Sequence, residues 1–524
     1  MAIVETLLAL LAACVLMALV ARRLGLPYAV VLVLGGSALA FVPGLPQVAL
    51  DPQIALAFFL PPLLMVSAYR TDWRAFRKEL RPILFLAVGA VFFTAACIAI
   101  VAKLLVPDLP WAAAIALGAI VAPPDAVAAA AVLQRLRLPR RMVIILEGES
   151  LVNDAASLVL YRLAVAGVAA GGFEWQQGIG QFSLSSAGGV AIGYVLARAC
   201  IWATMRLNDT LLETTLTFLV CFASFLTAES VHVSGVIAVV TTGIMLGQAQ
   251  HSTLTARTRM EARAVWVFVD FVLTSLVFIL VGLQLQEILE ALSVHDAGRI
   301  ATVALVLSVV LIASRFLWLF PATWVALLIP YVRRHHAAPP WQNTVVIGWA
   351  GMRGVVSLAA ALALPLEFPH RPLIVFLAFC AIFATLILQG TTLEWLIRKL
   401  GVELPPRRGM EPEEAVLRRL VSQAAATELQ SRLDSPLDGA IAADLLPEFR
   451  EKARVFHDAA EGASRAELTA RLQLRLSALR AGREALLVYH RETALSDEHL
   501  MVVSQDLDFE ELRLKQLLHG NGHG

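Results

Sequence analysis

The amino-acid sequence predicts an all-α polytopic membrane protein with about 13 transmembrane helices, followed by a small α-helical cytoplasmic domain. Hydrophobic residues make up 58% of the 524 residues and charged residues only 16%, and the mean hydropathy is +0.73. Apolar runs of about twenty residues recur along the first 400 positions, and a helix of that length crosses a bilayer. This composition excludes a soluble globular protein.

Hydropathy and the charges of the loops predict the order and orientation of the spans. The segments are expected at 2–21, 28–43, 53–69, 82–106, 111–134, 142–170, 183–205, 211–229, 233–249, 264–286, 300–329, 342–364 and 372–394. No basic residue precedes the first segment, whereas Arg22 and Arg23 follow it, so a cleaved signal peptide is not expected. Lys and Arg collect in alternate loops. The N-terminus is therefore predicted outside an inner or plasma membrane and the C-terminus in the cytoplasm.

A domain boundary is predicted near Pro405 and Pro406. It separates a transmembrane domain, 1–400, from a charged helical domain, 405–524, with helices at about 411–432, 439–460, 463–492 and 495–518. The sequence of this second domain contains no phosphate-binding loop, metal-ligand cluster or nucleophile motif. We expect it to have a regulatory or supporting role.

The fifth segment contains Pro123 and Pro124 in its middle, followed by Asp125. Each proline removes a backbone donor, so the helix should break and leave carbonyls free. Broken backbone at membrane depth is tolerated where it is buried in protein or lines a cavity, and free carbonyls beside a carboxylate attract Na⁺ or H⁺. The alternative is a proline kink in which Asp125 snorkels or caps the second half-helix.

Carboxylates also occur in the middle of the sixth segment, where residues 146–155 read LEGESLVNDA. At the centre of an isolated helix each would cost at least about 2.5–3.5 kcal/mol, so they indicate an ion path or a buried pair. Asp154 and Ser150 are four residues apart and share a helical face, where they offer oxygen ligands to a transported monovalent cation. Asn153 can hold the broken segment through its amide. Because Asp154 can be protonated or cation-bound but not both, one proton would be coupled to one cation.

The twelfth segment contains Arg353 between glycines. A buried arginine requires an anion, and Glu149 and Glu147 are the candidates. Since removing one partner of a buried pair costs roughly 3–5 kcal/mol, we interpret Glu149–Arg353 as a structural ion pair. Other charged residues at membrane depth remain unassigned: Arg198, Glu213, Asp270, Arg315 and Glu394.

Four stretches together resemble the monovalent cation/proton antiporter family of the sodium/proton exchanger type. They are FLPPLL at 59–64, PPDAVA at 123–128, EGESLVNDA at 147–155 and WAGMRG at 349–354. The resemblance implies inverted repeats, a homodimer and electroneutral exchange by an elevator-like movement. It also implies that Asp154 binds the ion with Ser150 and the break near Asp125, that Asn153 marks electroneutral transport, and that Glu149 pairs with Arg353.

Two departures from the family pattern concern the ion site. Many relatives carry an acidic residue two positions after PPLL, where this chain has Val66, so one carboxylate is missing. The commoner order at the broken helix is Asp-Pro, whereas here it is Pro124-Asp125.

The leading hypothesis is a secondary antiporter that exchanges Na⁺, with K⁺ or Li⁺ as alternatives, for H⁺ at Asp154. Its expected partners are monovalent cations, protons, membrane lipid and a second copy of the chain. We expect no cofactor and no enzymatic activity. We also expect no binding of nucleic acid, because basic patches interleaved with aromatics are absent from the sequence. The alternative, motivated by Val66, is a transport-dead sensor or scaffold that signals through its C-terminal domain.

Overall fold

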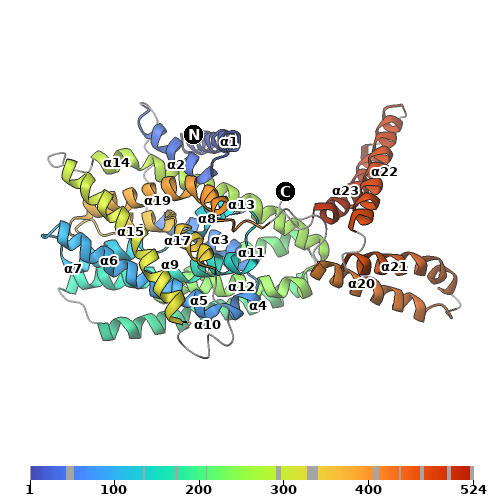
Figure 1. Ribbon diagram of the computed structural model, residues 1–524, viewed down its shortest axis with the longest axis horizontal. Coiled ribbons are helices and arrows are strands. Elements are labelled where there is room, and N and C mark those ends of the chain that lie inside the picture. Colours follow the sequence, from blue (N-terminus) through green and yellow to red (C-terminus); the bar gives the residue numbers. More distant parts are fainter. Residues whose placement is uncertain are drawn as a thin grey trace. The chain divides into compact units, whose positions relative to one another are not determined.

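The structure, a computed structural model, describes residues 2–42, 52–133, 136–170, 175–207, 209–290, 297–326, 340–404, 412–435, 438–460, 465–492 and 497–519. Its regular secondary structure over these ranges is helical (Figure 1). The chain divides into two compact units, Met1–Leu404 and Pro405–Gly524. Pro405 and Pro406, where we expected the boundary, lie outside the described residues. The regulatory role of the second unit stays a prediction.

The first unit is built from helices, most of them apolar. In chain order they are α1 (Ala2–Leu24), α2 (Tyr28–Ala40), α3 (Pro52–Arg70), α4 (Trp73–Lys78), α5 (Leu80–Leu84), the π-helix η1 (Phe85–Ala90), α6 (Val91–Leu105), α7 (Trp111–Val121), α8 (Ala126–Leu133), α9 (Arg140–Ala170), α10 (Trp175–Leu207), α11 (Thr210–Ser230), α12 (Gly235–Thr253), α13 (Ala256–Leu283), α14 (Leu285–Glu290), α15 (Ala297–Ala326), α17 (Trp341–Trp349), α18 (Val355–Leu362) and α19 (Arg371–Lys399).

Seven helices of the described chain are long and apolar enough to cross a membrane, and three apolar helices are shorter. Each predicted segment overlaps one of the helices or a consecutive group of them. The chain is therefore a multi-pass membrane protein. The number of thirteen spans and the orientation of the termini stay predictions.

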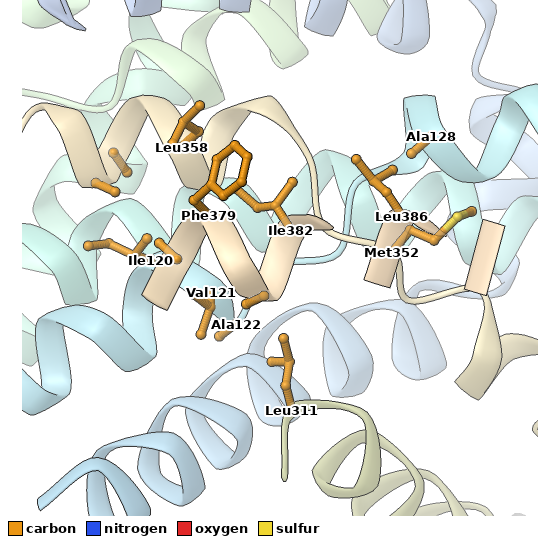
Figure 2. Close-up of a cluster of buried hydrophobic side chains, with 14 of the residues drawn as sticks. Ile120, Val121, Ala122, Ala128, Leu311, Met352, Leu358, Phe379, Ile382 and Leu386 are labelled. Carbon is orange, nitrogen blue, oxygen red and sulfur yellow. The ribbon is translucent and has the colours of Figure 1, made fainter. Parts of the chain in front are cut away.

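Two of the apolar segments are interrupted. The fifth consists of α7 and α8, and its break at residues 122–125 contains the two prolines, which cannot donate backbone hydrogen bonds. The twelfth consists of α17 and α18, with an irregular stretch at 350–354 that contains two glycines. Figure 2 shows Val121 directly before the first break, Ala122 in it and Met352 in the second, among apolar side chains. Both breaks are thus enclosed by the protein, as broken backbone in a membrane requires.

The apolar core of the first unit has two main parts. The larger collects buried side chains of α6, α7, α9, α15 and α17–α19, together with α1, α2 and α13. The second collects side chains of α3 and α10–α13 with Ala155 of α9. Close helix contacts depend on glycine: a Cβ added at Gly118 of α7 would collide with the carbonyl oxygen of Ala95 in α6. The two interrupted segments contribute mainly to the first part.

The second unit contains α20 (Pro412–Ser431), α21 (Gly439–Ala460), α22 (Arg465–Glu492) and α23 (Asp497–His519), close to the predicted ranges. Helices α22 and α23 share a small core of Leu472, Leu476 and Leu514. On α21, the Lys452 ammonium hydrogen-bonds the Glu448 carboxylate and holds the pKa of that group below its usual value. The unit is a set of helical pairs.

Candidate functional site

The two helix breaks meet inside the first unit. The backbone N–H of Asp125 donates to the carbonyl oxygen of Met352 at 2.7 Å. A Cβ added at Gly354 would overlap the carboxylate of Asp125, so that carboxylate lies directly against the residue that precedes α18. The unpaired N–H groups at a helix N-terminus favour a negative charge. The second break therefore positions Asp125, and glycine at 354 makes room for it.

Helix α9 is attached to the first break by two buried side chains. Asn153 Nδ2 donates to the carbonyl oxygen of Pro124 at 2.7 Å, which is the contact expected from the sequence. Ser157 Oγ donates to the carbonyl oxygen of Ala119, also at 2.7 Å. The Oδ1 atom of Asn153 is buried and has no hydrogen-bond partner among the described residues. The break is thus anchored to α9 on both sides.

Asp154 lies next to this anchor and is only 6% exposed. It interacts electrostatically with Asp125. Ser150 lies one turn earlier on α9 and is half-buried. The structure therefore places Asp154, Asp125, Asn153 and Pro124 at one crossing of α9 with the two breaks. Oxygen atoms beside irregular backbone are the surroundings in which membrane proteins hold Na⁺ or H⁺.

The structure corrects the predicted Glu149–Arg353 pair, because the carboxylate of Glu149 is bound by Arg315 of α15. Arg315 Nη1 and Nη2 donate to its two oxygens at 2.6 and 2.8 Å. The two side chains are 3% and 1% exposed, and Arg315 also donates to the carbonyl of Ile347 from Nε and Nη2, at 3.3 and 3.1 Å. The two-pronged geometry suits a guanidinium. Arg315, which the sequence analysis left unassigned, is the partner of Glu149.

Arg353 is a second buried cation close to this pair. It is 1% exposed, and its backbone N–H donates to Thr385 Oγ1 at 3.1 Å. Its side-chain Nε and Nη1 atoms have no hydrogen-bond partner in the described part of the chain. It interacts electrostatically with Glu149 and Arg315. Arg353 therefore adds positive charge to the crossing without being the hydrogen-bonded partner of Glu149.

Val66 lies where the family resemblance implied an additional acid. It is buried in the second part of the core, which also contains Leu64 of α3 and Ala155, the residue after Asp154. On α3 this region is therefore apolar at the position where a carboxylate was expected.

Comparison with known proteins identifies the family. Residues 7–399 match the sequence model of the family described as sodium/hydrogen exchanger, transmembrane. The chain belongs to this exchanger family. An uncharacterized Na⁺/H⁺ exchanger of Mycobacterium tuberculosis is 32% identical to it over 527 residues, which cover 97% of this chain and 95% of that protein. The Na⁺/H⁺ antiporter NhaS2 of Synechocystis is 32% identical over 433 residues, covering 83% and 77%.

The fold is that of a solved antiporter. The structure of the sodium proton antiporter MjNhaP1 from Methanocaldococcus jannaschii matches this exchanger with a TM-score of 0.61 at 19% identity, over 77% of this chain and 99% of that one. The predicted family and the predicted all-α membrane fold are therefore confirmed. Members of the family are transporters, so this exchanger is not an enzyme. The comparisons give no support to the alternative of a transport-dead sensor or scaffold.

Two residues of the candidate site, Arg315 and Ser157, were not predicted from the sequence. Arg315 carries a charge in the middle of an apolar segment, which was a signal of a buried partner. Ser157 follows Asn153 by four residues and so shares its helical face. The signal for Ser157 was Pro123, whose missing N–H leaves the carbonyl of Ala119 in need of a donor.

Proposed function

We propose that this exchanger moves Na⁺ in one direction and H⁺ in the other, and that Asp154 holds each of them in turn. The observation that carries the proposal is the burial of Asp154 at the crossing of the two breaks. A buried carboxylate is stable only when it is neutralised by a proton or paired with a cation. Arg315, a nearby permanent cation, is already bound to Glu149. Asp154 is therefore suited to alternate between H⁺ and Na⁺.

The proposed ligands are oxygen atoms of Asp154, Ser150 and the backbone around the first break, with Asp125 adding negative charge. The carbonyl of Pro124 already accepts the amide of Asn153. We therefore assign Pro124 and Asn153 to the shape of the site rather than to direct contact with the cation.

The buried charges support exchange of one Na⁺ for one H⁺. Glu149 and Arg315 cancel each other, and the positive charge of Arg353 balances the negative charge of Asp125 when that group is ionised. Asp154 then carries the one negative charge left at the crossing. One Na⁺ or one H⁺ neutralises it, so a cycle that exchanges them moves no net charge.

The protein works as a homodimer in a cell membrane, with the N-terminus outside and the helical C-terminal unit in the cytoplasm as a regulatory part. Na⁺ is the first choice of cargo because the relatives are named for Na⁺/H⁺ exchange. K⁺ and Li⁺ are the alternatives.

The test uses purified full-length protein in liposomes that enclose a pH-sensitive dye. Adding NaCl should change the internal pH, whereas choline chloride should not, and LiCl and KCl give the selectivity. An imposed membrane potential should leave the rate unchanged if the exchange is electroneutral. Asp154→Asn should abolish the Na⁺ response, while Glu147→Gln, a control on the exposed part of the same helix, should keep it. Full exchange by Asp154→Asn would refute the site assignment.

A further inference from the structure

The end of α7 has carbonyls that lack their usual helical donors. In an α-helix the carbonyl of residue i accepts the N–H of residue i+4. Residues 123 and 124 are prolines, so the carbonyls of Ala119 and Ile120 have no helical donor. Both residues are at most 1% exposed. A buried carbonyl without a partner is costly, and the fold must supply a donor from elsewhere.

Ser157 supplies the donor for the first of these carbonyls. Its Oγ atom lies 2.7 Å from the carbonyl oxygen of Ala119, and its side chain is 5% exposed. On α9 it lies four residues after Asn153, whose amide donates to Pro124 at 2.7 Å. The two side chains therefore hold the break from one helical face, Ser157 before the prolines and Asn153 at their end.

We propose that Ser157 is a positioning residue of the ion site. Its hydroxyl replaces the N–H that Pro123 lacks and keeps the end of α7 at a fixed place beside Asp154, which lies three residues earlier on α9. Ser157 does not contact the cation; it acts through the carbonyl of Ala119. The inference rests on the proposed function, because it assigns Ser157 to the site where Na⁺ and H⁺ are exchanged.

The positioning matters because the next two carbonyls have also lost their helical donors. The helical donor for the carbonyl of Ile120 would be residue 124, but this residue is a proline. The helical donor for the carbonyl of Val121 would be the N–H of Asp125, which donates to the carbonyl of Met352 instead. Carbonyls at the end of a half-helix attract cations. With Ala119 held by Ser157, the carbonyls of Ile120 and Val121 are the next two that lack their helical donors, and we assign them to the cation. A binding site functions only when its groups are held within about 0.5 Å.

Variants of full-length protein in liposomes test this role. Ser157→Ala should raise the apparent KM for Na⁺ about ten-fold and keep the maximal rate within about two-fold, because an unpaired buried acceptor weakens an equilibrium by about five- to a hundred-fold. Ser157→Thr keeps a hydroxyl and should keep KM within about two-fold of the original. Ser157→Val, which has nearly the shape of threonine, should behave like Ser157→Ala and separates the hydroxyl from packing.

The matched control is Ser308→Ala. Ser308 is a buried serine, 6% exposed, whose Oγ donates at 2.8 Å to the carbonyl of Ala304 in its own helix, α15. This control should leave KM unchanged. If KM rises as much for Ser308→Ala as for Ser157→Ala, the effect comes from the loss of any buried serine hydroxyl, and the proposal is overturned.

Amide hydrogen exchange of residues 111–128 gives a second readout that does not need transport. In Ser157→Ala and Ser157→Val the amide hydrogens of these residues should exchange with solvent faster than in the original protein, whereas in Ser157→Thr they should not. Unchanged exchange and unchanged KM in Ser157→Ala would overturn the positioning role, as would a threonine variant that behaves like the alanine variant. If the original protein moves no H⁺ in response to Na⁺, the proposed function fails, and hydrogen exchange alone still decides whether Ser157 holds α7.

Discussion

Replacing Arg315 should destabilise this exchanger more than replacing Arg353. Arg315→Met removes two hydrogen bonds to Glu149 and two to the carbonyl of Ile347, and it leaves a carboxylate that is 1% exposed. Breaking a buried ion pair from one side costs roughly 3–5 kcal/mol. Arg353→Met breaks no hydrogen bond of Nε or Nη1, because these atoms have none within the described chain. Arg353→Met leaves the charge of Asp125 unbalanced when that group is ionised, but it breaks none of the bonds that hold Glu149, so its cost should be smaller.

The assay is thermal unfolding of the detergent-solubilised protein, read by the loss of the monodisperse fraction. A double-mutant cycle with Glu149→Gln identifies the partner. The pair Glu149→Gln/Arg315→Met should be more stable than the sum of its single effects predicts, with a coupling of about 0.5–3 kcal/mol. Glu149→Gln with Arg353→Met should be closer to additive. If Arg353→Met is the more damaging change and shows the larger coupling, Arg353 is the partner of Glu149 and the reasoning from the structure is wrong.

Three further predictions concern the crossing. Asp154→Asn should fold, since it keeps the size of the side chain, but should lose Na⁺-driven H⁺ movement in liposomes; retained exchange would contradict the site. Asn153→Ala removes the amide that donates to the carbonyl of Pro124 at 2.7 Å, and we expect it to lower the stability by about 1–3 kcal/mol relative to the original protein, because a buried acceptor loses its donor. Gly354→Ala would drive a methyl group into the carboxylate of Asp125 and should abolish exchange; full activity in liposomes would show that this contact can be relieved without harm.

Much of the fold could be predicted because it depends on local properties. Helix positions follow from apolar length, and the break in the fifth segment follows from two prolines that cannot donate hydrogen bonds. The contact of Asn153 with this break was also accessible, because an amide beside free carbonyls has an evident partner. These inferences need no knowledge of which helices are neighbours.

The partner of Glu149 could not be predicted in this way. Two arginines, Arg315 and Arg353, lie on different segments, and which of them reaches the carboxylate depends on how α15 and the second break pack against α9. The family resemblance favoured Arg353, and the structure pairs the carboxylate with Arg315. Ser157 was missed for a related reason. A serine in an apolar helix commonly donates to its own helix, as Ser308 does, and only the three-dimensional placement shows that its acceptor is in α7.

The energies of these contacts indicate which of them can break during transport. Asn153 and Ser157 tie α9 to the first break, and the pair of Glu149 with Arg315 ties it to α15, all by buried bonds. The contact of α9 with α11 is different: Arg162 donates to both oxygens of Glu229 at 2.9 and 2.7 Å, but these side chains are 46% and 33% exposed. An exposed pair contributes about 0–1 kcal/mol, whereas breaking a buried one costs roughly 3–5 kcal/mol.

Helix α9 should therefore move together with the broken helices and α15, and separate from α11. Arg162→Gln should change the exchange rate by no more than about five-fold, because about 1 kcal/mol corresponds to that factor. A disulfide between Arg162→Cys and Glu229→Cys, in a background without the native cysteines, should stop exchange, and a reductant should restore it. Exchange that continues at full rate with this disulfide closed would show that α9 and α11 do not separate, and that the ion reaches Asp154 without such a movement.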